Sequence, residues 1–155
     1  MSVRPALQSD ADAVERLAAD FVAYLTELGD AAPRGLTAEE YVRDGFGARP
    51  AFCGLVAEDV TGVVGYLLYH EGYDIDRGGR VLHVVDLFVS TRARRRGFGR
   101  ALMEAAREAG RCSNANALLW TVYPPNVAAV AFYERLGAAL APDRLMSWPA
   151  SSDCL

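Results

Sequence analysis

Residues 81–89 form an almost wholly apolar run, and an arginine- and glycine-rich stretch follows it closely. A run this apolar is typical of a strand in the middle of a sheet that is covered on both faces. After the glycines, apolar residues such as Leu102 and Ala106 recur at helical spacing until Gly110, which predicts an amphipathic helix. A buried strand that leads through a short loop into a helix indicates an α/β fold.

Local signals predict the other elements. Ser9 is expected to cap a helix whose apolar positions lie three or four residues apart. Thr37 and Glu40 form a capping box at the start of a shorter helix. The predicted order is β-α-α-β-β-β-α-β-α-β, a mixed, mostly antiparallel central sheet flanked by helices in one domain over residues 1–155. The predicted strands cover 2–7, 51–58, 63–69, 81–89, 117–122 and 145–148, and the helices run from Ser9 to Leu28, from Thr37 to Gly45, from the glycine loop to Gly110 and from Asn126 to Leu136.

Composition excludes several classes of protein. The chain has 155 residues, of which 52% are hydrophobic, so a sizeable core can form and extensive disorder is excluded. A net charge of −4 disfavours a nucleic-acid binder that relies on bulk positive charge. Three scattered cysteines and two histidines predict neither a metal site nor a disulfide framework. No apolar run reaches the roughly 18 residues of a membrane span and the first residues lack a secretory signal, so a reducing, cytoplasmic location is expected.

The stretch from Arg94 to Gly99 has the chemistry of an anion site. Glycines let the backbone approach a ligand closely, and the first amides of the following helix lack intrahelical acceptors. There is no P-loop string, and Leu102 stands where a dinucleotide fingerprint needs its third glycine. What remains is an RxxGxG pattern that suits a pyrophosphate, or else a capped helix with a solvated arginine cluster.

A second motif lies downstream. Asn126 and Tyr133 are seven residues apart, about two helical turns, so their side chains share one face of a helix. A strand, an RxxGxG helix, a strand and an NxxAxxFYxxxGA helix, in this order, resemble the GNAT superfamily of N-acetyltransferases over essentially the whole chain. The resemblance implies the GNAT fold and acetyl-CoA as co-substrate, with no metal. It implies cofactor contacts from Leu87, Phe88, Val89, Arg94, Arg95, Arg96, Gly97, Phe98, Gly99, Arg100, Asn126, Ala129 and Arg135.

These implied contacts divide by role. The backbone of residues 87–89 would pair with the pantetheine arm as a further strand, and an amide there would stabilise the oxyanion. Asn126 would orient the amide portion of the cofactor, cap its helix, or do both. Arg135 is expected either to reach the adenosine end or to lie on a solvated helix face.

A narrower likeness is visible upstream. Residues 44–47, 64–66 and 86–89 are similar to the corresponding stretches of diamine (spermidine/spermine) N-acetyltransferases. That likeness implies a homodimer that acetylates primary amines of polyamines or of lysine-like amino acids. Val85 and Leu25 stand where that family carries carboxylates, and the loss of carboxylates removes charge-assisted hydrogen bonds to a polycation.

The resemblance also implies catalytic roles. Tyr133 would be the general acid, because a phenol can protonate a thiolate as it departs; the alternative is a buried aromatic residue. Asp86 is either the base that accepts the amine proton, the anchor of a cationic substrate, or a partner within the fold. Tyr24 and Tyr69 either line the acceptor pocket or serve ordinary packing.

The expected activity is transfer of acetyl from acetyl-CoA to a primary amine of a small molecule, by direct attack in a ternary complex. The candidates are a diamine, a polyamine or a lysine-like amino acid. The alternatives are acetylation of a protein N-terminus or lysine, modification of an antibiotic, and a non-catalytic acyl-CoA-binding sensor. The expected partners are the amine and a second copy of the chain, with no nucleic acid and no membrane.

Overall fold

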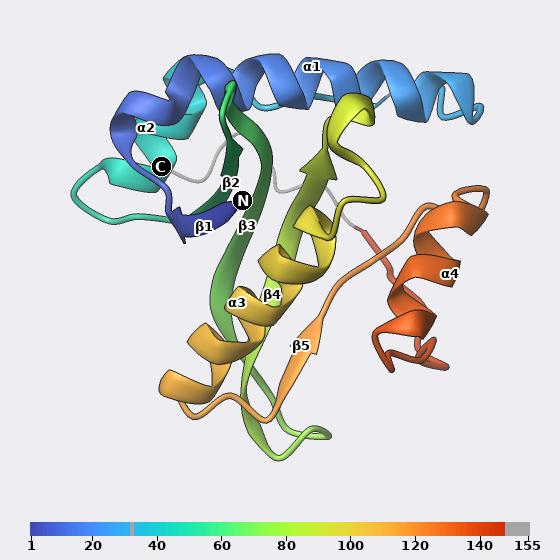
Figure 1. Cartoon of the computed structure of the whole chain (residues 1–155). Helices are drawn as coiled ribbons and strands as arrows, with labels where there is room; N and C mark the ends of the chain where they lie inside the picture. The colour runs from blue at the N-terminus through green and yellow to red at the C-terminus, as the bar shows by residue number, and fades with distance from the viewer. Residues whose placement is uncertain (32, 148–155) are drawn as a thin grey trace.

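The computed structural model describes residues 1–31 and 33–147, in which five strands form one mixed sheet (Figure 1). The strands lie in the order β1-β2-β3-β4-β5; neighbours from β1 to β4 are antiparallel, whereas β5 is parallel to β4. The predicted mixed, mostly antiparallel sheet is therefore confirmed. The strands are β1 Ser2–Pro5, β2 Cys53–Asp59, β3 Gly62–Asp74, β4 Gly79–Val89 and β5 Ala117–Leu119.

Helices cover both faces of the sheet. One core cluster joins the first two helices to one face and includes Val14, Tyr41 and Tyr66. A second cluster joins the third helix to the opposite face and includes Leu67 and Leu102. None of the helices within the described ranges has the length and apolar character that crossing a bilayer requires. The helices are α1 Ala11–Glu27, α2 Ala38–Phe46, α3 Phe98–Cys112 and α4 Val127–Arg135.

The helix starts agree with one predicted cap and correct another. The Thr37 hydroxyl oxygen accepts from the Glu40 amide and the Glu40 carboxylate accepts from the Thr37 amide, both at 3.2 Å, so the capping box of α2 is confirmed. Ser9 does not cap α1, because it lies inside a short 3-10 turn that precedes the helix. The carboxylate of Asp10 holds this turn instead, since it accepts a hydrogen bond from the Leu7 amide at 2.8 Å.

The predicted final strand is wrong where the structure describes it. Residues 145–147 do not belong to the sheet, and Leu145 and Met146 are exposed; Trp148 lies outside the described residues. The neighbouring strand explains the difference. Strand β5 ends at Leu119 instead of continuing to Val122, and so short a strand offers little ladder to a further partner. An apolar stretch of this length does not specify a strand by itself.

Strand β4 reverses the direction of its side chains at a β-bulge. Leu68 pairs with Asp86 and Tyr69 pairs with Val84, so Val85 is an extra residue without a partner on β3. As a result Val84 packs in the core cluster under α3, whereas Asp86 points to the face that α1 covers. Strand β4 pairs with β5 only near its start, and Figure 1 shows the two strands diverging beyond that point.

Candidate active site

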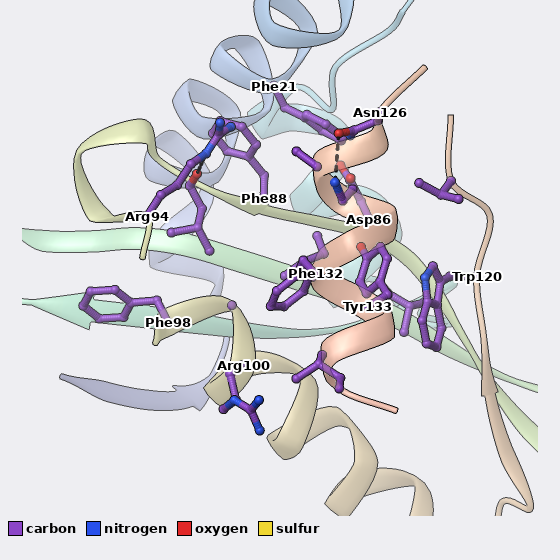
Figure 2. Close-up of a pocket in the computed structure, with 18 of the residues that line it drawn as sticks. Phe21, Asp86, Phe88, Arg94, Phe98, Arg100, Trp120, Asn126, Phe132 and Tyr133 are labelled. Carbon is purple, nitrogen blue, oxygen red and sulfur yellow. Dashed lines mark hydrogen bonds between the residues drawn. The ribbon is translucent and has the colours of Figure 1, made fainter. Parts of the chain in front are cut away.

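An open cleft of about 900 Å3 lies where β4 and β5 diverge. Its walls come from α1, the second half of β4, the start of α3, the segment after β5, and α4. Strands that diverge leave the backbone groups of their facing edges without ladder partners. The cleft therefore combines free backbone groups with the side chains drawn in Figure 2.

The N-terminus of α3 opens into this cleft. Gly97 is the N-cap residue, with a left-handed φ of +88°, and no side chain caps the helix. Arg95 also has a positive φ, of 61°, so the loop turns sharply just before the helix. The first turn of α3 contains no acidic residue, and Arg95 and Arg100 line the cleft beside it. Unsatisfied amides flanked by arginines form a donor set that fits a diphosphate.

The two glycines of this loop meet different requirements. Gly97 needs its left-handed conformation, and a Cβ there would meet nothing within 4 Å, so the space before the helix is open. Gly99 needs its small size, because a Cβ there would lie 3.2 Å from the ring of Phe132 on α4. The loop thus leaves room for a ligand on one side and lets α4 pack closely on the other.

Arg94 is held against aromatic rings inside the cleft. Its guanidinium carbon lies 4.5 Å from the centre of the Tyr24 ring and 5.4 Å from the centre of the Phe88 ring. Its Nε donates a hydrogen bond to the Val89 carbonyl at 3.1 Å. These contacts fix the charge of Arg94 between α1 and the end of β4.

Two predicted site residues lie outside the cleft. The Arg96 side chain points away from it and forms an ion pair with Asp59 at 3.2 Å. Tyr69 packs against the core cluster under α3, where burial raises the pKa of its hydroxyl. Tyr69 lies there because the register at the bulge pairs it with Val84, on the face of the sheet that is turned to α3. Neither side chain lines the cleft, so the structure does not bring them to the other site residues.

The end of β4 offers mainly backbone to the cleft. Leu87, Phe88 and Val89 all line it. The side chain of Phe88 is buried in the cluster under α1, and those of Leu87 and Val89 pack against the cluster under α3. A strand edge whose side chains are committed in this way can still bind an extended ligand through its amides and carbonyls.

Asp86 is the one acidic side chain among the described residues that line the cleft. Its Oδ2 accepts a hydrogen bond from the hydroxyl of the fully buried Tyr66 at 2.5 Å. Burial raises the pKa of Asp86 to about 6, against the opposing effect of the hydrogen bonds from Tyr66 and the Leu87 amide. The carboxyl group therefore ionises just below neutral pH, as a general base requires.

Tyr133 faces Asp86 from α4. Its ring centre lies 4.9 Å from that of Trp120 and 5.1 Å from that of Phe132. Burial, and then the negative charge of Asp86, raise the pKa of Tyr133 to about 12. Figure 2 shows the hydroxyl on the side of the ring that is turned to Asp86. The phenol therefore carries its proton at neutral pH, in the same cleft as the carboxylate.

Asn126 links α4 to α1. Its Oδ1 accepts hydrogen bonds from the Ala129 amide at 3.2 Å and from the Tyr24 hydroxyl at 2.9 Å. The predicted N-cap is therefore confirmed. Both bonds use Oδ1, so the amide NH2 group of Asn126, which takes part in neither, can donate to a ligand in the cleft. Its contact with a cofactor remains a prediction.

The remaining lining residues include some that the sequence analysis missed. Ala129 and Arg135 line the cleft, as do Phe21 and Trp120, which were not singled out. The helical period that brings Phe21 and Tyr24 to one face of α1 was a usable signal for Phe21. Nothing local marked Trp120. Among the described residues there is no group of three or more His, Cys, Asp or Glu side chains that could hold a metal ion.

Comparisons with known proteins agree with this geometry. The model of the acetyltransferase (GNAT) family matches residues 15–138, most of the chain. A mutant protein from Bacillus halodurans is 25% identical with a TM-score of 0.80, and the match covers 97% of this chain and 100% of that chain. An aminoglycoside acetyltransferase from an uncultured soil metagenomic sample is 21% identical with a TM-score of 0.72, over 97% of this chain and 98% of that chain. A ribosomal-protein-alanine N-acetyltransferase from Brucella melitensis biovar Abortus 2308 is 16% identical with a TM-score of 0.72, over 97% and 100%.

The family model, which covers most of the chain, identifies an acyl-transfer enzyme, here built on a mixed sheet. The chain belongs to the GNAT family of acetyltransferases, and it is an N-acetyltransferase. Enzymes of this family generally use acetyl-CoA. The two more distant structures share the fold with this chain, and the substrates in their names are those of the proteins that carry them.

Proposed function

We propose that this enzyme transfers the acetyl group of acetyl-CoA to the primary amine of a small molecule. The observation that carries the proposal is that Asp86 and Tyr133 line one cleft, where the charge of Asp86 helps to raise the pKa of Tyr133. Asp86 ionises near neutral pH and Tyr133 remains protonated there. One group can therefore accept a proton while the other donates one.

The chain offers a matching set of groups to acetyl-CoA. The amides at the start of α3, with Arg95 and Arg100, would hold the diphosphate. The open edge of β4 would pair with the pantetheine arm, and the amide NH2 of Asn126 would donate to it. When bound there, acetyl-CoA supplies an acetyl group that is activated as a thioester.

The proton movements follow from the two side chains. An amine is mostly protonated at neutral pH, so Asp86 would accept the proton that the amine must lose before its nitrogen bonds to the acetyl carbon. Tyr133 would give its proton to the sulfur as the carbon–sulfur bond breaks. A backbone amide of residues 87–89 would stabilise the carbonyl oxygen. The nitrogen gives up its second proton to the Tyr133 phenolate as the amide forms. The products are the acetylated amine and the free thiol, and Asp86 returns its proton to solvent.

A small acceptor is favoured over a peptide by the way the walls of the cleft are joined. The Tyr24 hydroxyl donates to Asn126, which ties α1 to the start of α4. A peptide substrate needs a groove that is open along its length, whereas a small amine fits between joined walls. Acetylation of a protein terminus or lysine remains the alternative that the same assay can detect.

The proposal is tested by measuring binding and turnover separately. Calorimetry with coenzyme A should show association, and release of thiol from acetyl-CoA should depend on an added amine. Tyr133→Phe should lower turnover by about 10²-fold or more while the affinity for coenzyme A stays within about twofold. Tyr73→Phe is the matched control, because Tyr73 is an exposed tyrosine on the β3–β4 hairpin. Equal loss of binding and turnover in Tyr133→Phe, or no association with coenzyme A, would contradict the proposal.

A further inference from the structure

The cleft offers a cation only one partner within the described part of the chain. Asp86 is its single acidic lining residue there. Arg95 and Arg100 pair with the diphosphate in the proposed complex, whereas Arg94 brings positive charge beside Tyr24 and Phe88. An ammonium group in a partly desolvated site is unfavourable unless a carboxylate pairs with it. A neighbouring guanidinium repels it further. The side chains that line the cleft therefore suit a ligand with one ammonium group.

The surroundings of Asp86 are aromatic on two sides. On the α1 side, Phe21 stacks on Phe88 with ring centres 5.2 Å apart. On the α4 side, Trp120 packs against Tyr133 with ring centres 4.9 Å apart. Rings on both sides of a single charged group complement an apolar, flat body that carries one polar end.

Arg94 would repel a second cation on the α1 side of the cleft. Its guanidinium lies over the rings of Tyr24 and Phe88 and is held there by the hydrogen bond to the Val89 carbonyl. An acceptor whose amine is at Asp86 and whose body lies along the α1 wall at Phe21 and Tyr24 extends toward this positive charge. A second ammonium at the far end would meet Arg94 instead of a carboxylate.

We infer that the acceptor is a monoamine with an apolar, ring-sized body, and that diamines and polyamines are poor substrates. The inference rests on the proposed function and names the substrate class of the same site. Leu25 is the residue whose side chain makes the α1 wall apolar beside Phe21 and Tyr24. It is therefore the specificity-determining position at which a second carboxylate would admit a second ammonium.

The experiment compares amines that differ by one charge. Thiol release from acetyl-CoA is measured with 2-phenylethylamine, pentylamine and pentane-1,5-diamine, and each amine is also titrated calorimetrically into the protein saturated with coenzyme A. The two monoamines should exceed the diamine in kcat/KM by roughly 10- to 100-fold, the range expected when a polar group is left unpaired. Calorimetry should give the same order of affinity.

Two variants add one carboxylate each to α1. Leu25→Glu should raise the kcat/KM of the diamine relative to pentylamine by about tenfold. Ala23→Glu is the matched control, because Ala23 is exposed on the same helix and does not line the cleft, so the ratio should not change. A wild-type preference for the diamine, or an unchanged ratio in Leu25→Glu, overturns the inference and leaves the proposed function intact. Absence of thiol release with every amine overturns both.

Discussion

Replacing Asp86 by Asn should stabilise the protein at neutral pH while it removes activity. Burial raises the pKa of this carboxyl from 3.8 to about 6 on folding. An acid with a higher pKa in the folded state loses stability as pH rises through the interval between the two values, and the loss is complete above it. A rise of this size corresponds to about 3 kcal/mol at pH 7. Asn avoids that penalty, and its side-chain oxygen can still accept the hydrogen bond from Tyr66.

The pH dependence makes the test specific. At pH 4.5 most of the penalty is absent, because the folded wild type keeps the proton, so the advantage of Asp86→Asn should fall to about 1 kcal/mol. For a chain of 155 residues, the difference at pH 7 corresponds to a rise in Tm of about 6–12 °C. Urea unfolding of both proteins without cofactor, at the two pH values, measures it. Asp76→Asn, in the exposed β3–β4 turn, is the control. A stability gain that does not change with pH, or a loss at both values, would refute the assignment of a desolvated carboxylate to position 86.

Two further substitutions test the proposed proton acceptor and the proposed diphosphate loop one at a time. Tyr66→Phe removes a hydrogen bond to the charged form of Asp86, so the acidic limb of the kcat/KM profile should move up by about one pH unit. Tyr41→Phe is the control, because it removes a buried hydroxyl elsewhere in the same cluster and should leave the acidic limb of the profile unchanged. If Tyr66→Phe also leaves that limb unchanged, Asp86 is excluded as the base. Gly97→Val should weaken coenzyme A binding by about tenfold or more, because a β-branched residue disfavours a φ of +88° and its side chain would occupy the open space proposed for the diphosphate. Gly62→Val has a similar backbone conformation in the β2–β3 turn, so equal effects on coenzyme A affinity would show that Gly97 acts through stability alone.

Local patterns predicted the parts of the site that depend on neighbouring residues. The glycine loop lies at the start of α3, and Asn126 caps α4, because caps and turns are determined within a few residues. The contacts between distant segments were not predictable in this way. The Tyr24 hydroxyl meets Asn126 across 102 positions of sequence, and such a meeting depends on how whole helices pack against the sheet. The predicted final strand failed for the same reason, since a strand exists only where a partner edge exists.

The contact between Tyr66 and Asp86 depends on the bulge at Val85, and that bulge connects the fold to the proposed chemistry. In a regular strand Val84 and Asp86 would share a face, and the carboxylate would point into the core under α3. The extra residue turns Asp86 to the α1 face, where Tyr66 binds it, and leaves a valine 55% exposed in a central strand. The desolvated carboxylate weakens the folded state at neutral pH, and the bulge that positions it exposes Val85. Both lie in the cleft lining, beside the open edge of β4. Local features that lower stability are expected where function requires them, and a general base for an amine requires a carboxylate held in this way.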